Sequence, residues 1–134
     1  PGRTIPKSTL LGMIQFGTAL KSKEPPYHRC LALSDPQSNG GQVLLVRLTT
    51  DDGTWPDRDC ILTPAGWGEL AHDSTVAYST CKYGPAVKAL ETAVQQGKFD
   101  VISSPSPAVL RKIILAGHHA AGMPPAAKRL LAKV

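Results

Sequence analysis

Short runs that are apolar throughout, or that alternate between apolar and polar residues, dominate the chain up to Ser103. Such runs are typical of β-strands when they are rich in β-branched residues and bounded by turn formers. The pattern predicts strands over residues 10–16, 28–34, 42–49, 60–63, 74–80 and 98–103.

Turn-forming residues separate these runs. Residues 1–9 are polar and expected to be loose, and residues 17–27 are expected to form a loop because Pro25 and Pro26 remove two backbone donors. Residues 35–41 are dense in Asp, Pro, Asn and Gly, so the strands on either side should form a hairpin with a long tip. Residues 50–59 should be a further loop, and residues 64–70 leave room for one helical turn.

Helical periodicity begins after the fifth run. Val87, Leu90 and Val94 recur at helical spacing and predict a helix over 85–96, with Pro85 at its first position and Gly97 as a left-handed stop. A second helix should open at Ser106-Pro107 and end near residue 117. After a break at 118–123, residues 124–134 should form a short basic helix.

The order of elements, strands first and helices mainly in the second half, predicts the fold class. It favours one α+β domain built on a small, mostly antiparallel barrel or strongly bent sheet, with the last helices appended. A chain of 134 residues is long enough for one hydrophobic core without disulfides or metals.

Charge and cysteine content limit the classes of protein to which this chain can belong. The net charge of +5 at pH 7 is compatible with a polyanionic partner. No apolar run approaches the ~20 residues of a membrane span, and no signal-peptide pattern occurs, so we expect a cytoplasmic protein without a membrane partner. Three cysteines without C-x-x-C spacing argue against a disulfide framework and a zinc site, and favour reduced thiols.

Motifs for cofactor or metal chemistry are absent from the sequence. There is no Gly-rich phosphate loop, no H-E-x-x-H and no G-x-S-x-G. Adjacent histidines at the end of a helix point to different sides, so His118-His119 is expected to be solvated. We therefore expect neither a cofactor nor a metal.

Polar residues at two strand ends are the remaining candidates for chemistry. His28-Arg29 opens one strand of the predicted hairpin and Thr49-Thr50 closes the next, so the four side chains should meet at one rim of the sheet. A guanidinium, an imidazole and two hydroxyls suit a phosphodiester, because they can stabilise charge on phosphorus and move a proton. The alternative is that the threonines are β-formers meeting a turn and Arg29 is a surface cation.

Several strings resemble the MazF/PemK family of toxin ribonucleases. YHRCLALSDP at residues 27–36 is similar to the family's "(G)HRPA-V-LSP" string, and VRLTT at 46–50 is similar to its "PxTT" or "PxTS" strand end. Residues 74–78 resemble an "S-V-V" strand. Residues 97–99 and 106–116 resemble a closing "G-x-L" turn and a final helix. The resemblance covers residues 10–117.

This resemblance implies a fold, an activity and partners. The fold would be an SH3-like barrel with appended helices, formed by residues 10–117 between the loose segment 1–9 and a basic helical extension 118–134. Family members form homodimers whose groove receives single-stranded RNA, and a cognate antitoxin blocks that groove. They cut RNA without a metal, through attack of the 2′-hydroxyl on the adjacent phosphate.

The resemblance also implies roles for individual residues. Arg29 would stabilise the phosphorane, Thr49 and Thr50 would hold phosphate oxygens, and His28 would bind substrate or transfer a proton. The further residues expected to contribute to substrate binding are Tyr27, Arg47, Ser79 and Lys82.

Three departures from the family pattern leave the activity open. Cys30 replaces the proline that follows the arginine, and residues 77–79 stand where the PemK branch has an "R-C-D" string. Asp51 and Asp52, directly after the threonines, are unfavourable for a polyanion. The alternatives to an endoribonuclease are a non-cleaving relative that binds nucleic acid or protein, and a basic barrel domain that shares only the topology.

Overall fold

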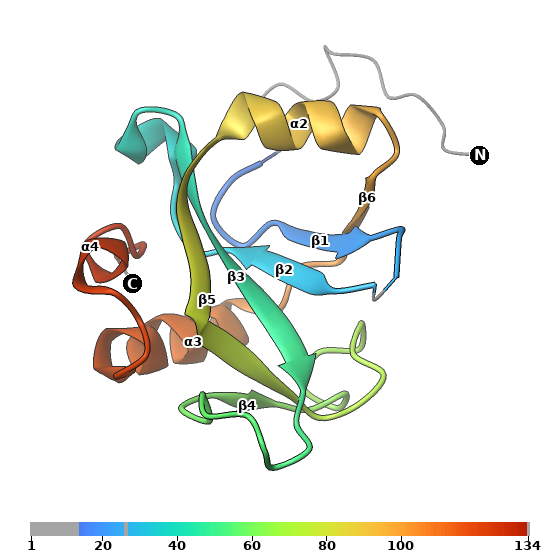
Figure 1. The fold of residues 1–134 in the computed structure, drawn as a ribbon, viewed down its shortest axis with the longest axis vertical. Helices are drawn as coiled ribbons and strands as arrows, with labels where there is room; N and C mark the ends of the chain where they lie inside the picture. Colours follow the sequence, from blue (N-terminus) through green and yellow to red (C-terminus); the bar gives the residue numbers. More distant parts are fainter. Residues whose placement is uncertain (1–13, 26, 134) are drawn as a thin grey trace.

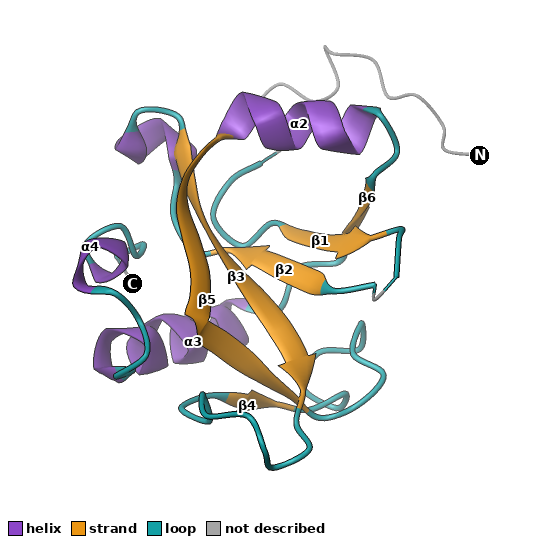
Figure 2. Ribbon diagram, in the orientation of Figure 1, coloured by secondary structure: helices purple, strands orange, loops and turns teal. Residues whose placement is uncertain are grey.

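The computed structural model describes residues 14–25 and 27–133, which form one sheet flanked by helices (Figures 1 and 2). The strands are β1 (Ala19–Ser22), β2 (Arg29–Ala32), β3 (Gln42–Thr50), β4 (Ile61–Leu62), β5 (Ser74–Ala86) and β6 (Phe99–Ile102). The helices are the 3₁₀ helix η1 (Pro36–Asn39) and the α-helices α2 (Val87–Gln95), α3 (Pro107–His119) and α4 (Pro125–Lys128). The predicted α+β class is confirmed.

All neighbouring strands of the sheet are antiparallel, in the order β4-β5-β3-β2-β1-β6. The long strands β3 and β5 change register twice along their length, which bends the sheet. In Figure 1, β1 and β2 run at a large angle to the bent β3–β5 pair and extend to its right. Within the described residues the edge strands β4 and β6 do not pair with each other, so the barrel stays open.

The two faces of the sheet belong to two hydrophobic clusters. Leu44, Val46 and Leu48 alternate along β3 toward the larger cluster, which α3 and the C-terminal segment cover. Val43, one residue before Leu44 and therefore on the other face, belongs to a smaller cluster with Val94 of α2. The larger cluster includes Ala120, Met123, Ala127 and Leu131, so the C-terminal segment contributes to the main core.

The N-terminal part differs from the prediction. Residues 10–13 of the predicted first strand lie outside the described residues, and residues 14–16 form no strand. The prediction of a loop over 17–27 is wrong, because β1 lies there and pairs with both β2 and β6. Ala19 and Leu20 are fully buried in it. Pro25 follows the end of β1, so it terminates the strand rather than preventing it.

The boundaries of the later elements also differ. The helix predicted from Pro85 begins at Val87, because β5 continues to Ala86 and pairs there with Gln42. Gly97 has φ 77° and ends this helix as predicted.

Three further elements differ from those predicted from the sequence. Residues 64–70 form turns without a helix. Helix α3 begins at Pro107, where the Ser106 hydroxyl accepts a hydrogen bond from Val109 N as an N-cap, and it continues to His119. The predicted basic helix over 124–134 is only Pro125–Lys128.

Candidate functional site

The β2–β3 hairpin brings the two predicted strand ends together. Arg29 lies opposite Leu48 in the register, and Thr50 lies opposite Ser74 of β5. A pocket of about 260 Å³ opens at this rim. Its lining residues are Tyr27, His28, Arg29, Leu48, Thr49, Thr50, Leu70 and Ser74.

Strand alternation distributes the polar side chains over both faces of the rim. Arg29 shares a face with its partner Leu48, and Thr50 is two residues further along that face. His28 and Thr49 lie one residue beyond the Arg29–Leu48 pair, on the opposite face, together with Arg47. The pocket is therefore at the end of the sheet, where both sets of side chains reach it.

His28 is held beside a permanent cation. Arg47 Nη1 lies 3.5 Å from His28 Nε2. Burial of the imidazole and the positive charge of Arg47 both lower the pKa of His28 below its ordinary value. Because arginine can only donate, this contact favours the tautomer in which Nε2 is the acceptor. The lowered pKa favours the neutral imidazole, and its acceptor nitrogen Nε2 can take up a proton only by giving up the contact with Arg47.

The two arginines of the hairpin carry unused donors. The Nε atoms of Arg29 and Arg47 are buried and have no hydrogen-bond partner within the described part of the chain. A buried donor without an acceptor is uncommon in folded proteins. An oxyanion at the rim would give these guanidinium groups an acceptor that matches their charge.

A loop from outside the hairpin completes the pocket. The segment between β4 and β5 supplies Leu70, and it is fixed at two points to the chain after β6. Trp67 Nε1 donates to Ser103 O at 2.9 Å, and Ser103 N donates to Glu69 Oε2 at 2.9 Å. Leu70 and Ser74 were not predicted as site residues, since no local signal in the sequence connects them to the hairpin.

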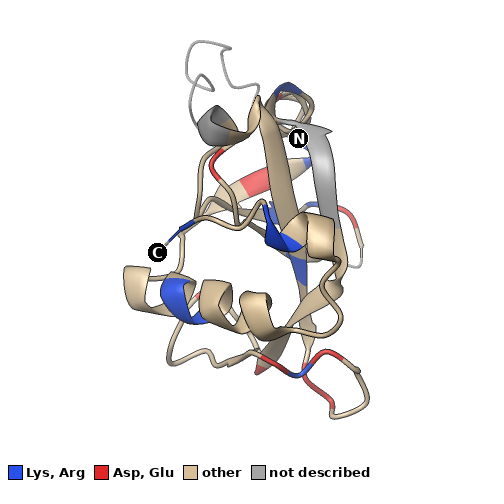
Figure 3. Ribbon diagram, turned by 90° about the vertical axis from the view of Figure 1, so that its left-hand side faces the viewer, with Lys and Arg blue, Asp and Glu red and all other residues tan. Residues whose placement is uncertain are grey.

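The acidic residues after β3 are engaged within their own loop. Arg58 forms a bidentate pair with Asp51, with Nε–Oδ1 at 3.2 Å and Nη2–Oδ2 at 3.0 Å. Asp52 Oδ1 accepts hydrogen bonds from Thr54 N at 2.9 Å and from its hydroxyl at 2.6 Å. Figure 3 shows red and blue segments alternating in this loop, at the lower end of the molecule. Of the two carboxylates next to Thr50, Asp51 is therefore paired with a cation, and Asp52 is hydrogen-bonded to Thr54.

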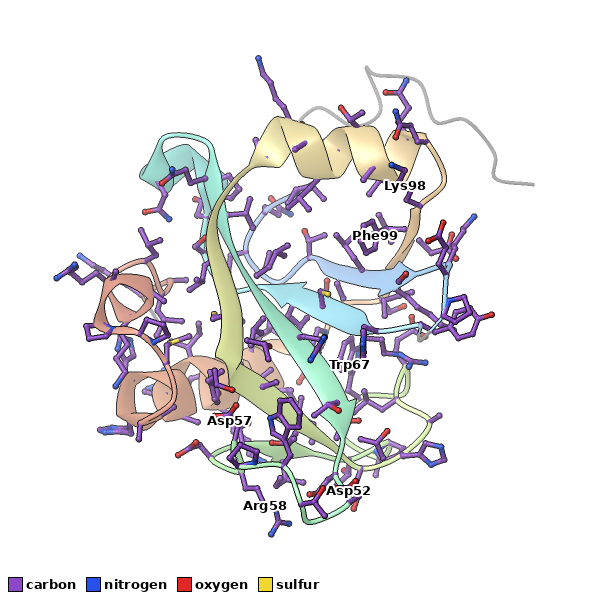
Figure 4. All side chains as sticks on the ribbon, viewed as in Figure 1. Asp52, Asp57, Arg58, Trp67, Lys98 and Phe99 are labelled. Atoms are coloured by element: carbon purple, nitrogen blue, oxygen red, sulfur yellow. The ribbon has the colours of Figure 1, made fainter. Side chains whose placement is uncertain are left out.

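This pocket's lining lacks three of the predicted binding residues, which are Arg47, Ser79 and Lys82. Ser79 donates to Asp57 Oδ2 through its backbone N, at 3.0 Å, and through its hydroxyl. Trp55 Nε1 also donates to this oxygen, at 3.2 Å, and Asp57 is only 4% exposed. Figure 4 shows Asp57 beside β5, away from the tip of the loop where Arg58 lies. The backbone of Lys82 pairs with Leu45, and its side chain lies outside the described residues.

The described residues offer few other candidates for a catalytic or metal-binding site. No group of three or more His, Cys, Asp and Glu side chains that could hold a metal ion occurs among them. His118 and His119 are exposed in the last turn of α3. No described helix combines the length and the apolar character that a membrane span requires.

Solved structures share this fold. An endoribonuclease in complex with its cognate antitoxin, from a mycobacterial species, matches with a TM-score of 0.53 and 21% identity, over 83% of this chain and 97% of the other. A MazE–MazF complex from Deinococcus radiodurans matches with a TM-score of 0.50 and 14% identity, over 83% and 97%. No protein-family model matches the sequence, and no curated protein matches it. The chain therefore has a MazF-like fold, as the resemblance implied.

Proposed function

We propose that the protein is a MazF/PemK-type endoribonuclease that cleaves single-stranded RNA at the pocket formed by the ends of β2 and β3. The observation that carries this proposal is the convergence of Arg29, His28, Thr49 and Thr50 on one pocket. Unused guanidinium donors beside that pocket suit an anion, and a neutral imidazole suits proton abstraction. The MazF-like fold supports the same reading by analogy.

The proposed reaction is a transesterification at phosphorus. The RNA 2′-oxygen attacks the adjacent phosphorus while its proton passes to the imidazole of His28. Arg29 stabilises the additional negative charge on the phosphorane, and the hydroxyls of Thr49 and Thr50 donate to its non-bridging oxygens. The P–O5′ bond breaks, and the departing 5′-oxygen takes up a proton from water. The products are a 2′,3′-cyclic phosphate and a 5′-hydroxyl, so the reaction needs no redox cofactor, and the family resemblance implies that it needs no metal.

Tyr27 and Arg47 belong to the proposed substrate-binding set because they adjoin this pocket. Tyr27 is among its lining residues, and Arg47 contacts His28. Ser79 and Lys82 stay in that set as predictions from the resemblance alone. The hydroxyl of Ser79 is already bound to Asp57.

We further propose that the protein acts as a cytoplasmic homodimer and that an antitoxin inhibits it. The support is the fold that it shares with a solved endoribonuclease–antitoxin complex and a MazE–MazF complex. Light scattering after size-exclusion chromatography tests the dimer. Co-purification with the product of an adjacent reading frame tests the antitoxin.

The decisive experiment is cleavage of a long single-stranded RNA by the purified protein in EDTA. We expect discrete fragments with 2′,3′-cyclic phosphate ends, and loss of cleavage in Arg29→Ala and in Thr49→Ala with unchanged circular dichroism. Arg111→Ala is the matched control, since this arginine is exposed on α3. Full activity in both site variants would refute the assigned site.

A second candidate function is binding of RNA without cleavage. The observation that favours it is the segment around Ala77 and Ser79, which lacks the arginine and aspartate of the PemK-type string. Ser79 instead uses its hydroxyl to hold Asp57. RNA that is retarded on a native gel but stays intact would support this candidate over the nuclease.

A further inference from the structure

The backbone of Tyr27 adopts a conformation that bulky residues rarely adopt. Its φ is 58°, and it is the one non-glycine residue with positive φ among the residues that the structure describes. In this left-handed region the Cβ atom crowds the backbone, so glycine adopts it freely and asparagine more readily than tyrosine. Tyr27 is therefore strained where it stands.

A tight turn between β1 and β2 imposes this conformation. Tyr27 N donates to Glu24 O at 2.9 Å, and Ser22 N donates to His28 O at 2.9 Å. The Ser22 hydroxyl also donates to Glu24 O at 3.1 Å and accepts from Glu24 N at 3.2 Å. These bonds use the backbone and the serine, and none of them needs the tyrosine ring.

Packing of the ring does not account for a tyrosine at this position. Tyr27 is 51% exposed and belongs to neither hydrophobic cluster. Its hydroxyl has no hydrogen bond within the described part of the chain. Tyr27 is among the residues that line the rim pocket, together with His28 and Arg29. Strained backbone that no packing explains is a feature that gathers at functional sites.

We propose that Tyr27 is a stacking platform for the RNA base next to the phosphate held at the rim pocket. This inference rests on the proposed function, because the ligand is the same RNA. Unpaired bases of single-stranded RNA stack on exposed aromatic side chains, whereas bases in a duplex are already stacked on each other. The ring thus selects single-stranded over double-stranded substrate, while Arg29, Thr49 and Thr50 hold the phosphate backbone of the RNA.

The proposal makes stability and binding respond in opposite directions. Replacing Tyr27 with glycine or asparagine relieves the strain at φ 58° and removes the platform. If Tyr27 served packing instead, replacing it would lower the stability of the protein together with its RNA binding. Phenylalanine keeps the platform and the strain, so it should leave both properties unchanged.

The test compares two probes, a single-stranded RNA hexamer and a hexamer of the same length with abasic sites. Wild-type protein should bind the base-bearing hexamer roughly tenfold more tightly, as expected for one base stacked on an aromatic ring. In Tyr27→Gly and Tyr27→Asn the two probes should bind about equally, and Tm should rise by about 2–4 °C. Tyr27→Phe should match wild type in both measurements.

Different results overturn different claims. Tyr27→Gly that keeps the wild-type preference for the base-bearing hexamer would refute stacking and leave the proposed nuclease intact. A lower Tm in both Tyr27→Gly and Tyr27→Asn would identify Tyr27 as a packing residue and refute the inference too. Wild-type protein that neither binds nor cleaves RNA would refute the proposed function itself.

Discussion

Arg47 Nη1 lies 3.5 Å from His28 Nε2, across the β2–β3 hairpin and on the same face of the sheet. The contact joins a permanent cation to the imidazole at the rim pocket. The pKa of His28 is lowered first by its burial and second by this positive charge. Arg47 therefore adds to the effect of burial in favouring the neutral form of His28.

Arg47→Gln should raise the pKa of His28 toward its ordinary value of 6.5, but only in part, because burial remains. A pH titration of the His28 ring protons by NMR measures this change, and the exposed His72 serves as an internal control. An unchanged His28 pKa in the variant would contradict the electrostatic role of Arg47.

The same shift predicts how stability depends on pH. Since the folded-state pKa of His28 lies below 6.5, the unfolded chain binds the proton first as pH falls. The contribution of His28 to the free energy of unfolding is thus complete above pH 6.5. It declines as the pH falls from 6.5 to the folded-state pKa. Urea unfolding between pH 7.5 and 5 should show a shallower decline for Arg47→Gln than for wild type.

The Asp51–Arg58 pair predicts an electrostatic effect on RNA binding. Arg58→Ala leaves the Asp51 carboxylate unpaired next to Thr50, so RNA affinity should fall severalfold, whereas Asp51→Asn should raise it. Arg58→Ala should also lower stability, because the Asp51 side chain is only 12% exposed and loses its charged partner. Fluorescence anisotropy at low and high salt measures the effect, which should shrink as salt screens the charges. Equal affinity in both variants would show that the loop does not face the RNA.

Asp57 should be a major contributor to stability. It is 4% exposed and accepts hydrogen bonds from Ser79 and Trp55, so Asp57→Ala removes the acceptor of three part-buried hydrogen bonds. We expect a loss of about 2–4 kcal/mol in the free energy of unfolding, and a smaller loss for Ser79→Ala. Urea denaturation measures both. Asp59→Ala, at an exposed position of the same loop, is the control and should change little.

The C-terminal segment should be required for folding. Leu131 is 6% exposed in the main core, and the neighbouring Ala132 N donates to Leu33 O at 2.9 Å. Leu131→Ala should lower the free energy of unfolding by about 2–4 kcal/mol. Leu115→Ala, at a position 46% exposed on α3, is the matched control. A stable, fully folded protein truncated after residue 117 would contradict this prediction.

Local chemistry was enough to predict much of the fold. The alternation in 42–49 and 74–80, the stop at Gly97 and the N-cap at Ser106 all depend on neighbours in sequence, and the structure contains each of them. The hairpin argument likewise brought His28 and Arg29 to the same rim as Thr49 and Thr50, because antiparallel pairing of adjacent strands fixes which ends meet.

Other features depended on contacts between distant parts of the chain. β1 was missed because Ala19–Ser22 is short, and its strand conformation comes from pairing with β2 and with β6, about eighty residues away. Leu70 reaches the pocket through bonds between its loop and Ser103. The sequence by itself determined the residue types at the rim and the antiparallel hairpin that gathers them. Only the tertiary structure decided that Arg47 contacts His28, that Asp57 binds Ser79 and that Tyr27 is held in a left-handed turn, since these depend on register and loop closure.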